Sequence, residues 1–237
     1  QSVNSNSFIN NNTVVTTTNT PTNRYPVWNP LGKGTTVALS NGNTKATGTS
    51  SWTTNNVIST LPLPQTGKWY WESYVGTATG TMGNSHGICN SSYKPSDGGV
   101  DANTWVIITN ASQTDMYLNA THIVGSLASD PPSVGDILRV AWDADNNNLY
   151  LGLGNDWMKS NGATGGNPSA GTNPSAAGLA ADTYYPFAAQ YNTNSTEYFE
   201  EADWTYSAPT GYIALNTTNL AAATTRTASD TNKYFQT

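Results

Sequence analysis

The sequence predicts an all-β protein in which two antiparallel sheets pack face to face as a sandwich. Only 10 % of the 237 residues are charged, whereas 11 % are aromatic, including 8 Trp and 13 Tyr. Aromatic residues and Thr favour strands, while the frequent Asn, Gly and Ser favour the turns that join strands. No segment carries a convincing apolar period of 3.6 residues, so helices are not expected. Two packed sheets are the simplest architecture for such strands.

The clearest single strand is the segment GKWYWESYV at residues 67–75. It places Trp69, Tyr70, Trp71 and Tyr74 within six residues, a density that suits a pleated and half-buried strand. A proline-containing turn precedes this segment, and a Gly/Thr/Ala break follows it. We therefore expect a central strand of the core.

Further strands are expected on both sides of this segment. Residues 35–40 are the first candidate and run into Asn41-Gly42, a hairpin signal because both positions tolerate a positive φ. The next candidates, all bounded by turn-forming residues, are residues 85–89, 105–109 and 116–124.

The most regular hairpin lies in the second half of the chain. Residues 136–142 alternate between apolar and polar, residues 143–147 form a polar turn, and residues 148–153 return. Residues 184–191 and 196–200 are predicted to be the closing pair of strands.

The sandwich is expected to occupy residues 24–220, with polar segments at both ends. Residues 1–23 read as an extended arm that contacts other chains by adding a strand to a neighbouring sheet or by wrapping over it. The alternative interpretation of this arm is a disordered leader. Residues 221–237 read as a linker-like tail, and the Gly/Pro-rich residues 160–181 as a surface loop that adds little stability. The few apolar residues of the arm are Phe8, Ile9, Val14 and Val15.

Composition excludes several classes of partner and site. The net charge of −6, together with scattered basic residues, makes nucleic acid a poor partner. No apolar run reaches the ~20 residues that a membrane-spanning helix needs, so membrane insertion is not expected. The single cysteine, Cys89, excludes an internal disulfide and a cysteine-based metal site, and is interpreted as a small buried hydrophobe.

No group of residues predicts a catalytic site, a cofactor or a metal. Residues 143–147 resemble the first half of a calcium loop, but the required Gly and Glu are replaced by Asn148 and Gly154, so a polar turn is preferred. His86 and His122 lie far apart, which argues against zinc. Glycosidase chemistry needs two facing carboxylates, and no spacing selects a pair among the candidates, which are Glu72, Glu197, Glu200, Glu201 and Asp203.

Three aromatic residues stand in loop contexts rather than in predicted strands. Trp52, Tyr93 and Trp157 are therefore the candidates for a surface that contacts a ligand or a partner. An exposed Trp or Tyr offers rigid contact area at a low cost in conformational entropy.

Several segments, taken in order, resemble SPRY domains, particularly those of tailed-phage virion proteins. They are residues 29–31 with 39–43, 67–72, 86–89, 135–143 with 149–151, 182–186, and 209–216 with 219–220. Residues 199–203, Phe-Glu-Glu-Ala-Asp, depart from the phage pattern, which usually has Gly, Gln and Arg after the Phe. The contact made by that basic residue is therefore not carried over to this chain.

The resemblance implies a bent, concanavalin-like β-sandwich, in effect a jelly roll, that serves binding or assembly without catalysis. It further implies a structural protein of a phage virion, such as a tail appendage, a fibre or a capsid decoration. The expected partners are other copies of the chain, other virion proteins, and a host surface glycan or protein. The alternative is a secreted or cell-surface protein that binds or cleaves carbohydrate, and a third reading is a surface-layer or adhesin subunit.

Overall fold

The computed structural model describes residues 23–49, 54–76, 83–95, 100–109, 112–127 and 130–220. The candidate contact residue Trp52, the predicted tail and residues 1–22 of the predicted arm lie outside the described residues. The arm residues concerned are Phe8, Ile9, Val14 and Val15.

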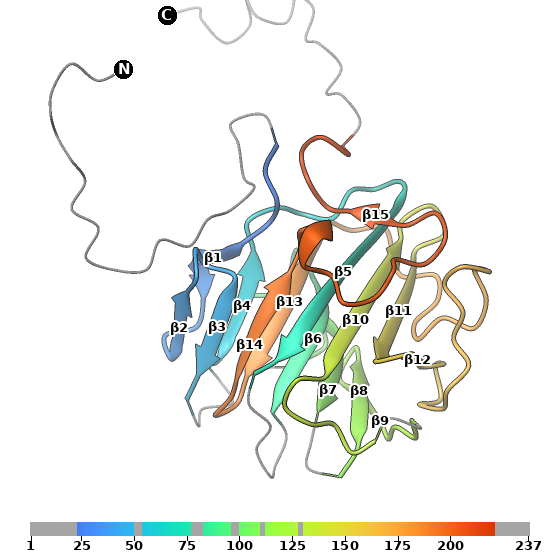
Figure 1. The fold of residues 1–237 in the computed structure, drawn as a ribbon, viewed down its shortest axis with the longest axis horizontal. Coiled ribbons are helices and arrows are strands. Elements are labelled where there is room, and N and C mark those ends of the chain that lie inside the picture. The colour runs from blue at the N-terminus through green and yellow to red at the C-terminus, as the bar shows by residue number, and fades with distance from the viewer. Residues whose placement is uncertain are drawn as a thin grey trace, which may run out of the picture.

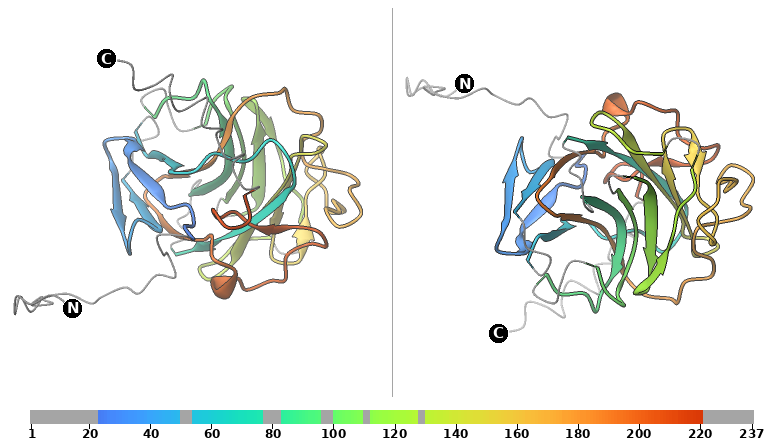
Figure 2. Two further views of the ribbon diagram at one scale, coloured as in Figure 1. Left: turned by 90° about the horizontal axis from the view of Figure 1, so that it is seen from above. Right: turned by 90° about the horizontal axis from the view of Figure 1, so that it is seen from below.

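The described chain forms two sheets that pack face to face, as the sequence predicts (Figure 1). The two curved layers are also visible from above and below in Figure 2. Sheet A contains, in spatial order, β1 (Trp28–Lys33), β4 (Asn56–Ser59), β13 (Tyr184–Gln190), β6 (Asn84–Asn90), β7 (Thr104–Thr109), β8 (Thr114–Leu118) and β9 (Thr121–Ile123). Sheet B contains β12 (Asp156–Trp157), β11 (Asn148–Leu153), β10 (Ile137–Asp143), β5 (Lys68–Val75), β14 (Asn194–Tyr198), β3 (Lys45–Gly48) and β2 (Val37–Ser40), with β15 (Ile213–Ala214) beside β5.

Strand β5 is the central strand that the aromatic segment predicts. It lies between β10 and β14 in the middle of sheet B. Trp69 and Trp71 point into the main core between the sheets, whereas Tyr70 belongs to a second apolar cluster on the outer face. Because both faces of the strand are covered, aromatic residues occupy successive positions instead of alternating with polar ones.

Two predicted turns are confirmed by their backbone geometry. Strands β10 and β11 pair from Leu138↔Leu153 to Asp143↔Asn148, around a polar turn. The Asp143 carboxylate accepts hydrogen bonds from the backbone and side chain of Asn146 at 3.2 and 3.0 Å. In the turn after β2, Asn41 and Gly42 have φ values of 52° and 64°, as their sequence requires.

The predicted closing pair is wrong, because β13 and β14 lie in different sheets. β13 pairs with β4 and β6 in sheet A, whereas β14 pairs with β5 and β3 in sheet B. The short connection between them carries the chain across the sandwich. In it, Asn192 has a φ of 53°, and the Gly48 N–H donates to Thr193 O at 3.0 Å.

The predicted strand at residues 116–124 is instead a tight hairpin. Strands β8 and β9 pair across a turn in which Asn119 and Ala120 have positive φ values of 53° and 64°. An alanine in this conformation gives no turn signal in the sequence, which explains the difference. The sequence analysis also did not anticipate β1, β3, β4, β12 and β15.

Residues 160–181 contain no named strand, as expected, but they are packed and not a loose excursion. Leu149 and Ala176 exchange two backbone hydrogen bonds of 2.8 and 3.1 Å along the edge of β11. The buried Ser175 Oγ donates to Met158 O at 2.7 Å and accepts from Leu151 N at 2.9 Å. The loop therefore covers the edge of sheet B, and the prediction that it adds little stability is not supported by its contacts.

Two further expectations can be compared with the described residues. Cys89 is buried among Tyr93, Val106 and Phe187, as predicted for a small hydrophobe, and burial raises the pKa of its thiol. Within the described ranges, no helix has the length and apolar character that crossing a membrane requires.

Candidate functional site

A polar network lies in the core between the two sheets. His86 on β6 contacts Glu197 on β14 through Nδ1 and Oε1 at 2.5 Å, and Ser73 Oγ on β5 through Nε2 at 3.1 Å. Gln190 Nε2 on β13 lies 3.1 Å from the same His86 Nε2 and donates to Ser195 Oγ at 2.9 Å. We call these five residues the interior network. It joins two strands of each sheet across the core.

The interior network has the connectivity of a serine hydrolase triad, with an acid at Nδ1 and a serine at Nε2. However, Ser73 and His86 are both 0 % exposed. A nucleophile must stand beside a cleft that admits substrate, and no cleft reaches Ser73 in the described residues. Every strand that contributes to the network is also paired on both sides. The arrangement therefore satisfies buried polar groups and ties the sheets together.

A second polar cluster holds the C-terminal part of the chain on the outer face of sheet B. We call residues 204–216, which cross this face, the strap. Glu72 is fully buried, and its carboxylate accepts from Tyr70 Oη at 2.6 Å, from Thr205 N at 2.7 Å and from Tyr206 N at 2.9 Å. Arg139 Nε donates to Tyr70 Oη at 2.9 Å. Burial raises the pKa of the Tyr70 hydroxyl, which keeps it protonated and able to donate.

The guanidinium of Arg139 is enclosed by aromatic rings beneath the strap. It lies 4.5 Å from the ring centroid of Trp157, 4.7 Å from that of Tyr206 and 5.6 Å from that of Tyr70. Its NH1 and NH2 groups donate to Gly154 O and Ser207 O at 2.9 and 3.3 Å. The positive charge is thus fully used inside the protein.

The expectation that Tyr93 and Trp157 are exposed is wrong. Trp157 is only 8 % exposed because it packs between Arg139 and Tyr70, and Tyr93 is only 6 % exposed. Tyr93 meets Phe187 edge to face at 5.0 Å on the outer face of sheet A. Both rings are consumed by packing, so neither offers a contact surface; Trp52 lies outside the described residues.

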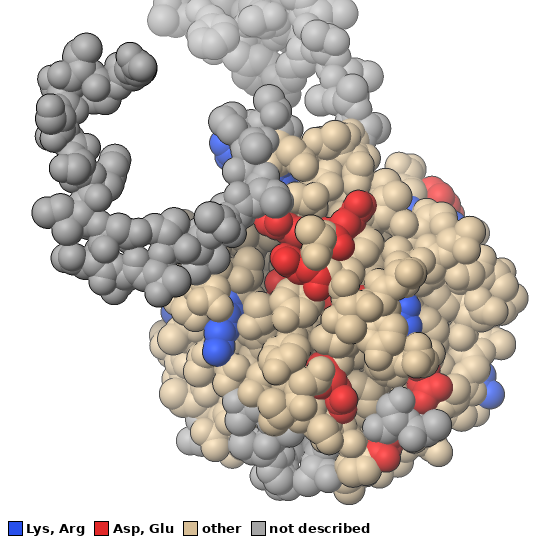
Figure 3. Space-filling model, viewed as in Figure 1, with Lys and Arg blue, Asp and Glu red and all other residues tan. Residues whose placement is uncertain are grey.

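The candidate carboxylates do not converge on one cleft. Glu197 pairs with Ser73 and points into the core, whereas Glu72 points to the outer face of the same sheet. Glu201 and Asp203 lie in the short helix η1 (Glu201–Asp203) next to Glu200, and acidic side chains gather over this region in Figure 3. Desolvation and the neighbouring Glu200 raise the pKa of Asp203.

The two histidines remain separate in the fold. His86 belongs to the interior network, whereas His122 on β9 contacts Asp115 at 3.1 Å and stacks on Tyr117. Among the residues that the structure describes, no group of three or more His, Cys, Asp or Glu could hold a metal ion.

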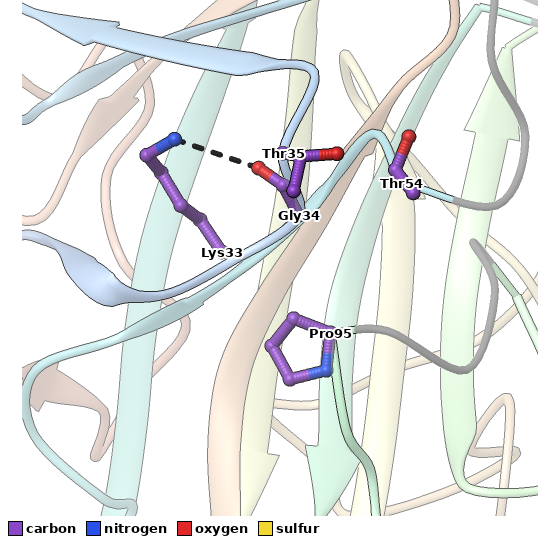
Figure 4. A pocket seen from close by; sticks show the side chains of 5 residues that line it. All are labelled: Lys33, Gly34, Thr35, Thr54 and Pro95. Carbon is purple, nitrogen blue, oxygen red and sulfur yellow. Dashed lines mark hydrogen bonds between the residues drawn. The ribbon is translucent and has the colours of Figure 1, made fainter.

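A small pocket opens on the surface where the β1–β2 turn approaches the start of β4. Its volume is about 140 Å³, and it is lined by Lys33, Gly34, Thr35, Thr54 and Pro95 (Figure 4). The Lys33 ammonium donates to Val37 O at 2.7 Å, so the lysine presents its aliphatic stem to the pocket. The lining is therefore mostly apolar.

The backbone of the pocket needs Gly34. Thr36 N donates to Thr54 O at 3.1 Å, which brings the two segments together, and a Cβ on Gly34 would lie 2.0 Å from Thr54 O. Sequence reasoning missed this pocket because its walls come from three separate turns and contain no residue type associated with chemistry. The glycine was the only available signal, and a glycine in a turn is too common to single out.

Comparison with known proteins relates this chain to solved structures only. No family model matches the sequence, and no curated protein matches it. The SPRY domain of human HERC1 is similar with a TM-score of 0.52 and 14 % identity, covering 72 % of this chain and 96 % of that one.

Two further structures are similar to a smaller degree. The TRIM65 PSpry domain gives a TM-score of 0.49 and 12 % identity, over 74 % of this chain and 91 % of that one. Stonustoxin gives 0.48 and 17 %, over 74 % of this chain and 27 % of that one. Together with the two antiparallel sheets, the HERC1 comparison shows that the described residues adopt a SPRY-type β-sandwich fold.

Proposed function

We propose that the protein is a non-catalytic binding and assembly module whose recognition site is the pocket beside Gly34. The observation that carries this proposal is the size and lining of the pocket. At about 140 Å³ it is smaller than the ~300–1,000 Å³ of typical small-molecule sites. A cavity of about 150 Å³ holds a group the size of benzene. The pocket thus suits one apolar side chain of a partner protein.

The use of the polar side chains supports a non-catalytic role. The groups with the most reactive chemistry are held inside the sandwich: His86 and Glu197 in the interior network, and Glu72 under the strap. Catalysis requires such groups to meet substrate. A surface that offers an apolar pocket and no accessible nucleophile is suited to recognition.

The finer proposal is a structural role in a virion, such as a phage tail appendage, a fibre or a capsid decoration. It is supported by the ordered series of sequence motifs that resembles phage SPRY domains. In this proposal the chain resides on the particle, and its polar ends contact copies of itself or other virion proteins.

NMR titration of the full chain with small probes tests the recognition site. Phenol and N-acetyl-leucinamide represent protein side chains, and N-acetylglucosamine represents a glycan. The side-chain probes should shift the amide resonances of Gly34 and Thr54 with millimolar affinity, and the sugar should not. Shifts caused by the sugar alone would favour the carbohydrate-binding alternative.

A pocket-filling substitution provides the matched variant. Thr35 is exposed, so Thr35→Trp should fill the pocket without disturbing the core, and it should abolish the shifts. Thr121→Trp places the same ring on exposed β9 and should leave them unchanged. Persistence of the shifts at Gly34 and Thr54 in Thr35→Trp would contradict the proposed site.

A further inference from the structure

The first and last described segments of the sandwich are joined to each other. The backbone N–H of Arg24 donates to Thr217 Oγ1 at 2.9 Å, and the N–H of Thr217 donates to Arg24 O at 3.0 Å. The N–H of Thr218 also lies 3.4 Å from Asn23 Oδ1. The described chain therefore begins and ends at one place, which is visible at the upper side of Figure 1.

This junction and the pocket lie at opposite ends of β4. Thr60 N donates to Val27 O at 2.8 Å, so the start of the described chain lies beyond the C-terminal end of β4. Thr54, which lines the pocket, precedes the N-terminal end of the same strand. Six residues of extended strand separate Thr54 from Thr60, a distance of about 20 Å.

The sheet edges next to the junction are already occupied by the protein's own groups. On β1, Pro30 has no N–H, and the N–H of Leu31 donates to Asn29 Oδ1 at 2.9 Å. On β2, Val37 O accepts from Lys33 Nζ at 2.7 Å. Such devices block the pairing of a further strand. A segment that contacts this region from another chain must therefore do so mainly through its side chains.

The composition of residues 1–22 indicates what they can contact. This segment has no Asp, Glu, Lys or Arg, although the whole chain has a net charge of −6. An uncharged segment can lie on another copy of a negatively charged protein without adding repulsion. A sandwich of roughly 200 residues is about 40 Å across, whereas 22 extended residues reach about 70 Å. Residues 1–22 are long enough to cross a neighbouring copy.

We propose that residues 1–22 and 221–237 act as one attachment to a single neighbouring copy of this chain. Because the junction holds Asn23 and Thr218 together, both segments leave the sandwich at one pole. The self-association is therefore made at that pole, and the pocket at the other end of β4 stays open for a different partner. This inference rests on the proposed function, since it assigns the assembly contact and the recognition site to opposite poles.

A reversible cross-link across the junction tests the inference in the full chain. The double variant Asn23→Cys/Thr218→Cys should form a disulfide on oxidation, because neighbouring positions in paired extended segments have suitable geometry. The native Cys89 is buried and should not interfere. Oligomeric state is measured by light scattering with and without reductant. Asn23→Cys alone is the control for effects of the thiol.

The outcomes separate this inference from the proposed function. Self-association to the same extent in the oxidised and reduced forms supports a single attachment. Association only when reduced would show that the two segments must separate to reach different neighbours, which overturns the inference and leaves the proposed function standing. A monomer under both conditions would overturn the choice of a second copy as partner. Loss of the probe shifts at Gly34 would instead count against the proposed recognition site.

A second variant addresses the arm itself while leaving the junction intact. Replacing the four apolar residues of the arm should weaken self-association at least tenfold and leave the melting temperature of the sandwich unchanged. Val124→Ser/Val134→Ser, which removes exposed apolar side chains from the sandwich, should have no such effect. Unchanged association in the arm variant would overturn the inference. The arm substitutions are Phe8→Ser, Ile9→Ser, Val14→Ser and Val15→Ser.

Discussion

Removal of the Glu72 carboxylate is expected to release the strap and to destabilise the fold. Glu72 is fully buried and accepts hydrogen bonds from Tyr70 Oη, Thr205 N and Tyr206 N. Hydrogen bonds to a charged group contribute about 1.5–3 kcal/mol each. Their simple sum overestimates the loss, because the strap can lift and expose its freed N–H groups to water. Breaking a buried charged contact by removing one partner typically costs about 3–5 kcal/mol.

We therefore expect Glu72→Ala to lower the free energy of unfolding by about 3–5 kcal/mol. For a domain of this size, that corresponds to a melting temperature lower by roughly 6–20 °C. Glu72→Gln should cost less, about 1.5–3 kcal/mol, because one oxygen remains as an acceptor while the new amide faces a backbone N–H.

Urea unfolding followed by tryptophan fluorescence measures these differences, and Trp204 reports locally on the strap. Its ring meets Tyr70 edge to face at 4.8 Å, and its Nε1 donates to Tyr198 O at 2.8 Å. The control is Glu201→Gln, because Glu201 is exposed and receives only one long hydrogen bond, from Ala214 N at 3.4 Å. A Glu72→Ala protein within about 1 kcal/mol of the parent would refute the role assigned to this carboxylate.

Three further outcomes follow from the described contacts. Ser175→Ala should lower stability by about 1–3 kcal/mol, because its hydroxyl bridges Met158 and β11; unchanged urea unfolding would show that the 160–181 loop is dispensable. The raised pKa of Asp203, caused by desolvation and by Glu200, disfavours the ionised form in the folded state, so stability is lost as pH rises through that pKa. Asp203→Asn should thus raise the melting temperature at pH 7 but not below the ordinary Asp pKa of about 3.9, and an equal effect at both pH values would argue against this cause. A fluorophosphonate probe for nucleophilic serines should leave the folded protein unlabelled because Ser73 is buried; labelling that disappears in Ser73→Ala would reveal a hydrolase.

Local features of the fold could be predicted where the sequence pattern depends on neighbouring residues alone. The strand at residues 67–75 carries its signal in the density of aromatic side chains. The Asn41-Gly42 turn and the turn of the β10–β11 hairpin require residues that tolerate positive φ, and the chain supplies them at those positions. Such preferences act within a few residues, so they can be recognised without knowledge of the partner strands.

Burial depends instead on what the rest of the chain places over a residue. Trp157 stands in a two-residue strand that looks like a loop, yet Arg139 and the strap cover its ring. Tyr93 follows β6 in the sequence but packs on Phe187 of β13. Their loop-like sequence context therefore indicated exposure wrongly, because the covering residues lie far away in the chain.

What the sequence by itself determined is the class of the protein: an all-β chain with a central aromatic strand and an acidic, uncharged-armed composition. Only the tertiary structure decided which sheet each strand joins, and it separated β13 from β14, which are adjacent in the chain. It also brought Ser73, His86 and Glu197 together from three strands and buried them. Strand pairing and burial are contacts between distant segments, and period-2 patterning has the same form whichever sheet a strand enters.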